Sequence, residues 1–286
     1  MSGWFTETWS QGVRFSVEYA EETYAERTPF QNIAFYRSDA LGRFFSIDGV
    51  MMASEKDEYV YHEMIVHVPL SVRPGIRDVL VIGGGDGGTV RELTRYASIR
   101  SIDLVEIDRR VVDLCRVYFP VTTTGLDDAR VSMIFTDGAK YVAGTKKKYD
   151  LVIVDSTDPI GPGEGLFTAA FYQDCLRILN PDGILVNQHE SPYFPETRRE
   201  MARAHAKLKA IFPIARVYQA FIPTYPSGHW LFGFAAKAAD PLCDFVAGVQ
   251  AAAGIATKYY NEDVHRAAFA LPNDVREALA EASPRP

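Results

Sequence analysis

The fold of this chain is decided by the stretch Val79-Leu80-Val81-Ile82-Gly83-Gly84-Gly85-Asp86-Gly87-Gly88. Its apolar first half, rich in Val and Ile, is typical of a buried parallel strand. The glycines that follow predict a tight turn that leads into a helix and lets a ligand approach the backbone closely. An acidic residue, Asp86, stands inside that turn.

Three further apolar runs are followed by acidic residues in the same way. The runs cover residues 102–105, 131–135 and 151–154, and the acids that follow them are Glu106, Asp137 and Asp155. In open α/β sheets, ligands bind outside the carboxyl ends of the strands, where the strand order reverses. We therefore expect these acids and Asp86 to converge on one cleft, which makes the chain a candidate enzyme.

From about residue 76, apolar runs alternate with helix-like stretches, which predicts an α/β fold with a doubly wound parallel sheet. Helices are expected at 89–96, 110–118, 168–179 and 196–211, further strands at 184–188, 215–220 and 230–235, and a glycine-rich loop at 161–165. That loop has the composition of a mobile lid, although a plain surface loop explains it nearly as well.

Residues 1 to about 53 have a β-rich pattern, with strands expected at 30–37 and 43–47 and a hairpin signal at Asp48-Gly49. The sequence of residues 54–57 resembles a capping box that opens a helix, and Pro69 is expected to end that helix. We therefore predict an N-terminal β-rich domain with a connecting helix over residues 1–70. A catalytic domain with a C-terminal extension is predicted over residues 71–286.

The composition is that of an ordinary globular protein, with 286 residues, 47% hydrophobic and 23% charged. A net charge of −7 argues against nucleic acid as a partner and suits a small cationic ligand, although solubility alone also explains it. No apolar run approaches the roughly 20 residues of a membrane helix, and no signal peptide is recognisable. Three widely spaced cysteines fit reduced thiols, so we expect a cytoplasmic protein.

The glycine turn formally matches a dinucleotide fingerprint, with Glu106 about 20 residues further on at the position of a ribose-binding acid. A carboxylate beside a diphosphate is repulsive, however, and Asp86 stands inside the turn. A nucleoside without phosphates is the better interpretation, with Glu106 on the ribose hydroxyls and Asp137 near the adenine amino group. The alternative is a structural turn with a solvated Asp86.

A second pair of acids lies in the segment Asp155-Ser156-Thr157-Asp158-Pro159. Two carboxylates at a strand end suit an alkylammonium group, and one of them could accept a proton from an attacking amine. Asp158 could equally be a turn residue before proline. Metal binding is not expected, because His62 and His67 are five residues apart, whereas helical metal ligands on one face need a spacing of four.

Taken together, these motifs resemble those of the spermidine synthases, the aminopropyltransferases of polyamine synthesis. The resemblance spans nearly the whole chain and rests on Gln31-Asn32, Asp48-Gly49-Val50, Asp57 to Met64, Gly83 to Gly88, Glu106-Ile107-Asp108, Asp137-Gly138, Asp155 to Pro162, Ile222 to Gly228 and His265 to Pro272.

The resemblance implies a Rossmann-like, methyltransferase-type domain with a small N-terminal β-domain, assembled as a homodimer or homotetramer. It implies transfer of an aminopropyl group from decarboxylated S-adenosylmethionine, a co-substrate rather than a tightly bound cofactor, to putrescine. The products would be spermidine and methylthioadenosine. The gate would be the loop around residues 157–166.

The resemblance also assigns roles to individual residues. The donor would be held by Gln31, Asp86, Glu106, Asp137, Gly138 and Pro162. The acceptor side would consist of Tyr61, His62, Asp86, Asp155, Asp158, Gln188 and Tyr225, with Asp155 as the catalytic proton acceptor.

Other functions remain open at this point. The acceptor could be agmatine, cadaverine or spermidine, or the reaction could be diamine N-methylation. A nicotinamide dehydrogenase is disfavoured, because the acids near residues 137 and 155 have no evident role in hydride transfer. A polyamine-binding sensor without turnover is the non-enzymatic alternative.

Overall fold

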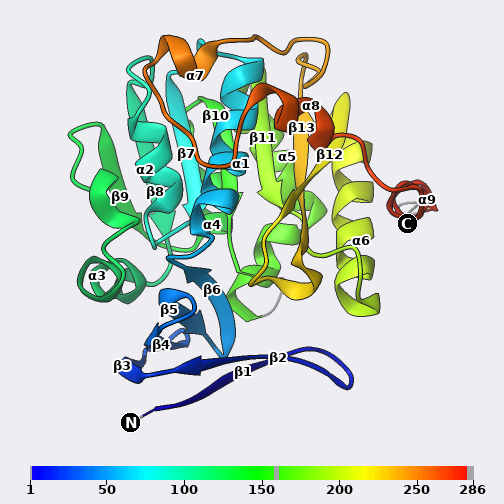
Figure 1. The fold of residues 1–286 in the computed structure, drawn as a ribbon. Coiled ribbons are helices and arrows are strands. Elements are labelled where there is room, and N and C mark those ends of the chain that lie inside the picture. The colour runs from blue at the N-terminus through cyan, green and yellow to red at the C-terminus, as the bar shows by residue number, and fades with distance from the viewer. Residues whose placement is uncertain (1, 158–160, 282–286) are drawn as a thin grey trace.

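The computed structural model describes residues 2–157 and 161–281. Figure 1 shows a small β-domain below a larger α/β domain. The small domain consists of a hairpin, β1 (Gly3–Ser10) and β2 (Val13–Tyr19), and a four-stranded antiparallel sheet, β3 (Glu21–Arg27), β4 (Asn32–Ser38), β5 (Gly42–Ile47) and β6 (Val50–Ser54). The predicted β-rich N-terminal region is therefore confirmed.

The larger domain is built on a seven-stranded sheet with the order β12-β13-β11-β10-β7-β8-β9. These strands are β7 (Asp78–Gly83), β8 (Ser101–Glu106), β9 (Val131–Phe135), β10 (Tyr149–Asp155), β11 (Leu179–Gln188), β12 (Ile214–Phe221) and β13 (His229–Ala236). Strands β7 to β11 are parallel, which confirms the doubly wound arrangement, whereas β13 runs antiparallel to both of its neighbours. The strand order reverses between β7 and β10, where such sheets bind ligands.

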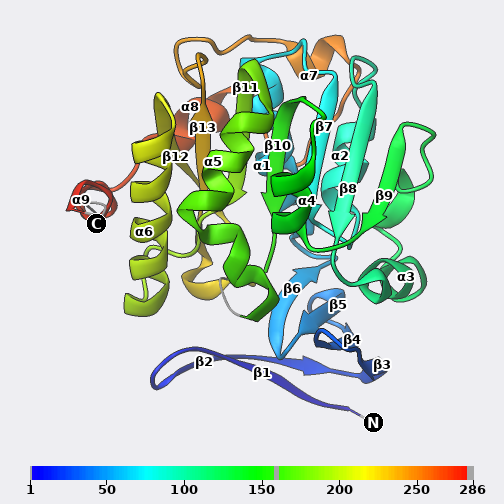
Figure 2. The same ribbon diagram turned by 180° about the vertical axis from the view of Figure 1, so that it is seen from behind.

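Helices cover both faces of the large sheet (Figures 1 and 2). They are α1 (Glu58–Val72), α2 (Gly88–Thr94), α3 (Arg109–Tyr118), α4 (Gly138–Gly144), α5 (Ala169–Ile178), α6 (Pro195–Ile211), α7 (Val249–Ala252), α8 (Glu262–Ala268) and α9 (Asn273–Glu281), with 3-10 turns η1 (Thr123–Gly125), η2 (Gly161–Phe167) and η3 (Pro226–Gly228). One hydrophobic core lies between the sheet and α1 and α2, and another lies between the sheet and α4, α5 and α6. Within the described ranges, no helix has the length and apolar character needed to cross a membrane.

Three expected features differ from the structure. The capping box expected at residues 54–57 is not formed, because α1 begins after Asp57, whose side chain makes no capping hydrogen bond. Pro69 does not end α1, which continues to Val72, where the N–H of Arg73 donates to the Pro69 carbonyl at 3.0 Å. Proline removes one backbone donor, but the dense packing around this part of α1 holds the last turn in place. The segment expected to be a loop at 161–165 instead forms the 3-10 helix η2.

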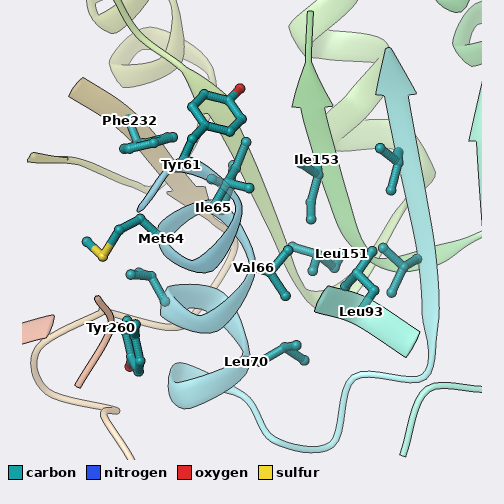
Figure 3. Packing of buried hydrophobic residues seen from close by; sticks show 14 of the residues in the cluster. Tyr61, Met64, Ile65, Val66, Leu70, Leu93, Leu151, Ile153, Phe232 and Tyr260 are labelled. Carbon is teal, nitrogen blue, oxygen red and sulfur yellow. The ribbon is translucent and has the colours of Figure 1, made fainter. Parts of the chain in front are cut away.

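Helix α1 is buried along almost its whole length, and Figure 3 shows its side chains against the central strands. Met64, Ile65, Val66 and Leu70 belong to the same core as residues of β10, β13 and α2. The Glu63 carboxylate accepts backbone N–H bonds from residues 258, 259 and 260, each at 2.8 Å, and so fastens α1 to the C-terminal segment. Because α1 also carries residues 61 and 62, the burial of this helix in the core fixes one wall of the candidate site.

Candidate active site

A cavity of about 410 Å³ lies at the carboxyl ends of β7, β8 and β10, between the two domains. The small β-domain contributes apolar walls from β5 and β6, including Phe45, Ile47 and Met52. Ten of the residues predicted to form the site line this cavity: Gln31, Tyr61, His62, Asp86, Glu106, Asp137, Gly138, Asp155, Gln188 and Tyr225. Asp158 lies outside the described residues, and of Pro162 only the backbone, in η2, is described.

The glycine turn after β7 brings the backbone against the acids at the neighbouring strand ends. A Cβ atom at Gly84 would lie 2.7 Å from Asp155 Oδ2, and one at Gly85 would lie 2.8 Å from Glu106 Oε2. Gly84 also has φ near +68°, which residues with a Cβ rarely adopt. The glycines therefore let three strand ends meet closely enough to share one cavity.

Glu106 is buried where β8 ends, and one of its oxygens accepts the Asp108 N–H at 2.9 Å. Burial and the nearby charge of Asp108 raise the pKa of Glu106, backbone N–H groups partly offset them, and the net result is a pKa of about 7. The Asp108 carboxylate in turn accepts from Thr28 Oγ1 at 2.7 Å and Gln31 Nε2 at 3.1 Å. These bonds join the β-domain to this end of the cavity.

Asp137 and Gly138 begin α4, a helix that the sequence patterns did not predict. The Asp137 carboxylate caps the helix by accepting the Lys140 N–H at 3.1 Å. A Cβ at Gly138 would lie 2.4 Å from Ile82 Cγ2, so only glycine lets α4 start this close to β7. The two residues thereby form the wall of the cavity next to Glu106.

Asp155, at the end of β10, is held by two hydroxyl groups. Tyr61 donates to Oδ1 and Thr89 donates to Oδ2, each at 2.7 Å. Burial raises the pKa of Asp155, and the negative charge of Asp86 raises it further. A partly buried carboxylate with a raised pKa, fixed in orientation on both oxygens, is a suitable proton acceptor.

Asp86 has an acceptor oxygen that the described residues leave open. Its Oδ1 accepts the Gly88 N–H at 3.4 Å, whereas the buried Oδ2 accepts no hydrogen bond from the described part of the chain. His62 Nε2 lies 3.3 Å from that Oδ2, close enough for ion pairing but without hydrogen-bond geometry. An open anionic acceptor in a buried position favours a ligand that brings a positive charge and N–H donors.

One group of His and Asp side chains in the described ranges is compact enough to surround a cation. The ligand atoms of His62, Asp86 and Asp155 all lie within 4.8 Å of one another. Both ring nitrogens of His62 face carboxylate oxygens, since Nδ1 lies 2.7 Å from Glu58 Oε2, so the ring offers N–H donors rather than a lone pair for a metal. His67 bonds Tyr96 and does not line the cavity. The group suits an organic ammonium.

The other end of the cavity is aromatic and polar. The ring centroids of Tyr61 and Tyr225 lie 6.0 Å apart, and those of Tyr225 and Trp230 lie 4.8 Å apart, both edge to face. Tyr225 donates to the Met52 carbonyl at 2.6 Å, which fixes its ring. Gln188, at the end of β11, accepts the Glu190 N–H at 3.1 Å. Aromatic walls with polar ends fit an extended alkyl chain that carries an ammonium group.

Three functional positions were missed by the sequence patterns. Thr89 bonds Asp155, Glu58 bonds His62, and Trp230 lines the cavity. Thr89 directly follows the glycine turn and Glu58 lies four residues before His62, so both carried a local signal. Trp230 had none, because only the return of β13 to the sheet brings it to the site.

Comparison with known proteins identifies the family. The family described as Spermine/spermidine synthase domain matches residues 58–246, and the Spermidine synthase tetramerisation domain matches residues 3–55. Polyamine aminopropyltransferases of Clostridium perfringens (strain 13 / Type A) and Alkaliphilus oremlandii are 58% and 54% identical over 279 residues, which is 98% of each chain. The enzyme of Clostridioides difficile is 55% identical over 282 residues, 98% of this chain and 100% of its own.

Solved structures agree with this. Spermidine synthase from Thermotoga maritima has a TM-score of 0.92 at 39% identity, covering 97% of this chain and 94% of its own. A spermidine synthase in complex with the transition state analogue AdoDATO has a TM-score of 0.94, with the same identity and coverage. By sequence and fold, the chain therefore belongs to the spermine/spermidine synthase family and is an enzyme of the polyamine aminopropyltransferase class.

Proposed function

We propose that the enzyme transfers the aminopropyl group of decarboxylated S-adenosylmethionine to putrescine, releasing spermidine and methylthioadenosine. The observation that carries this proposal is the open, buried Asp86 Oδ2 beside Asp155, in the same cavity as Glu106. That arrangement offers a carboxylate for a donor ammonium, a proton acceptor for an attacking amine and a carboxylate for ribose hydroxyls. The likeness to a spermidine synthase bound to AdoDATO supports the same reaction.

In the proposed complex, Glu106 accepts hydrogen bonds from the ribose hydroxyls, and Asp137, Gly138, Gln31 and Pro162 surround the nucleoside. Asp86 receives the terminal ammonium of the aminopropyl arm. The donor's sulfonium makes the adjacent carbon electrophilic without help from the protein. The main task of this half of the site is therefore to align that carbon for in-line attack.

The acceptor diamine occupies the aromatic end of the cavity. Asp155 and Tyr61 hold the attacking nitrogen, and Gln188, Tyr225 and Asp158 line the remainder of the path. His62 lies where this path meets Asp86. At pH 7 only about one alkylamine in a few thousand is neutral, because its pKa lies near 10.4. As the new N–C bond forms, the C–S electron pair moves to sulfur to give the thioether, and the nitrogen's proton passes to Asp155.

Product analysis tests the proposal. Purified enzyme is incubated with putrescine and with each donor separately, and the products are identified by mass. Spermidine from the decarboxylated donor supports the proposal, whereas N-methylputrescine from ordinary S-adenosylmethionine overturns it. A faster reaction with agmatine, cadaverine or spermidine would reassign the acceptor, and polyamine binding without turnover would indicate a sensor.

The raised pKa of Glu106 predicts pH-dependent nucleoside binding. Ribose hydroxyls donate to the ionised carboxylate, so the ligand binds the form that exists above a pKa of about 7. The affinity for methylthioadenosine should rise as pH rises through that value and should be about tenfold weaker at about pH 6 than at its plateau. Calorimetric titrations at about pH 6 and at a pH on the plateau check this. The dependence should disappear in Glu106→Gln, and a flat profile in the unmodified enzyme would contradict the assignment.

We also propose that the chain assembles as a homodimer or homotetramer through residues 3–55. The match of this segment to the Spermidine synthase tetramerisation domain supports this, as do Trp4 and Phe30, which are 64% and 44% exposed. Light scattering would show a mass of two or four chains.

A cytoplasmic location is proposed, because the thiols of Cys115, Cys175 and Cys243 are free. The nucleoside donor is proposed to be a co-substrate, so none is expected to remain bound after purification.

A further inference from the structure

We propose that Glu58 is a positioning residue which, together with Arg91, keeps the His62 ring doubly protonated and directed at Asp86. His62 then acts as a fixed positive charge that stabilises the negative charge of Asp86 and Asp155 before the donor binds. This inference deepens the proposed function and rests on it for the identity of the donor.

Glu58 is placed behind His62 by the helix itself. It lies in the first turn of α1, four residues before His62, so the two side chains share one helix face. Glu58 Oε2 lies 2.7 Å from His62 Nδ1, and both side chains are almost completely buried. Glu58 does not line the cavity, so it can act on the donor only through the ring.

Arg91 of α2 completes the support from the other side. Its two terminal nitrogens donate to the two oxygens of Glu58, each at 2.9 Å, in a bidentate pair. Such a pair fixes the plane of the carboxylate as well as its charge. Burial raises the pKa of Glu58, but the bonds to His62 and Arg91 outweigh this effect and lower it to about 2. Glu58 is therefore an anion at every physiological pH.

The contacts of the His62 ring favour a proton on each of its two nitrogens. Nδ1 faces Glu58 and Nε2 faces Asp86 Oδ2 at 3.3 Å, while a neutral imidazole has only one N–H. The other nitrogen would then present its lone pair to a carboxylate. Burial lowers the pKa of His62, but the charges of Asp86 and Glu58 outweigh it and raise the pKa to about 10.

Neighbouring groups restrict the orientation of the His62 ring. An added Cβ at Gly88 would lie 2.2 Å from His62 Cε1, so the α2 backbone covers one side of the ring. The edge of Tyr61 packs against it with centroids 5.4 Å apart. Among the described residues, the ionisable groups that contact the ring are Glu58, Asp86 and Tyr61, and Asp155 and Arg91 lie beyond them.

The His62 imidazolium offsets the repulsion between the Asp86 and Asp155 carboxylates. Besides burial, the negative charge of Asp86 raises the pKa of Asp155, because two carboxylates this close repel each other, whereas the charge of His62 lowers it. A protonated Asp86 could not bind the donor's ammonium as an ion pair. Because Glu58 keeps the ring protonated, the His62 imidazolium stabilises the negative charge on both carboxylates.

Glu58→Gln tests this inference directly, because it keeps the shape and removes the charge. The NMR signal of His62, assigned by its loss in His62→Asn, should not titrate between about pH 6 and about pH 8.5 in the unmodified enzyme and should titrate inside that range in Glu58→Gln. At neutral pH the KM for the decarboxylated donor should rise about tenfold, as for loss of one charge-assisted hydrogen bond. The affinity for methylthioadenosine, which lacks the amine, should change less than about twofold.

Glu63→Gln is the matched control, a buried glutamate on the same helix that bonds the C-terminal segment instead. It should lower thermal stability without changing the His62 titration or the donor KM. Should Glu58→Gln fold poorly, Arg91→Lys tests the same support and should shift both readouts in the same direction by a smaller amount. A His62 signal that titrates alike in the enzyme and in Glu58→Gln, or an unchanged donor KM, overturns the inference. If His62 behaves as expected in both proteins but the unmodified enzyme makes no spermidine, the proposed function is overturned instead.

Discussion

Replacing Asp155 with asparagine is expected to lower kcat by about 10²- to 10⁴-fold, the usual contribution of a positioned general base. The amide keeps the size of the side chain but cannot accept the proton of the attacking amine. It also removes the negative charge that holds the substrate ammonium, although the side chain can still accept a hydrogen bond from Tyr61 or Thr89. Rapid-quench measurement of spermidine formation at saturating substrate gives the rate of the chemical step.

Nucleoside affinity provides the control for Asp155→Asn. Methylthioadenosine binding should stay within about twofold, because Glu106 and Asp137 are on other strands. Asp150→Asn is the matched variant, because Asp150 is a buried aspartate on the same strand. It lies at the opposite end of that strand, where its carboxylate accepts the backbone N–H groups of Arg77 and Asp78. It should affect stability and not kcat. Near-normal turnover in Asp155→Asn would remove Asp155 from its proposed role.

Replacing Asp86 with asparagine is expected to lower kcat/KM for the decarboxylated donor by on the order of 10²-fold or more, the usual cost of breaking a buried charge pair. The open Oδ2 is the only position in our account that receives the donor's ammonium. The same change should weaken discrimination against ordinary S-adenosylmethionine, whose carboxylate Asp86 repels. Steady-state kinetics with each donor measure both effects.

The control for Asp86→Asn is the affinity of the variant for methylthioadenosine. Methylthioadenosine has the same nucleoside and no amine, so its affinity should be nearly unchanged. An equal loss for both ligands would mean that Asp86 shapes the nucleoside pocket rather than binding the ammonium.

The parallel part of the fold could be predicted from the sequence because buried parallel strands have continuous apolar runs. Since such strands end at the same edge of the sheet, the acids after β7, β8, β9 and β10 could be expected to meet. The direction of β12 and β13 could not be predicted, because apolar runs carry no information about strand orientation. Helix α4 was missed because seven residues give little periodicity, although Asp137 provides its cap.

The contacts that hold His62 in place join segments that are distant in the chain and therefore could not be predicted from the sequence. The spacing of Glu58 and His62 is visible, but Arg91 is 33 residues from Glu58 and reaches it only when α2 packs on α1. Pro69 was misleading for the same reason, since tertiary packing overrides its local preference to end a helix.

The central claim is that one cavity holds the nucleoside and the diamine side by side. The most direct test is an experimental structure of the enzyme with methylthioadenosine and putrescine bound together. We predict the ribose against Glu106 and one putrescine nitrogen within hydrogen-bond reach of Asp155, facing the methylthio end of the nucleoside. A diamine bound elsewhere, or a nucleoside that does not contact Glu106, would contradict it.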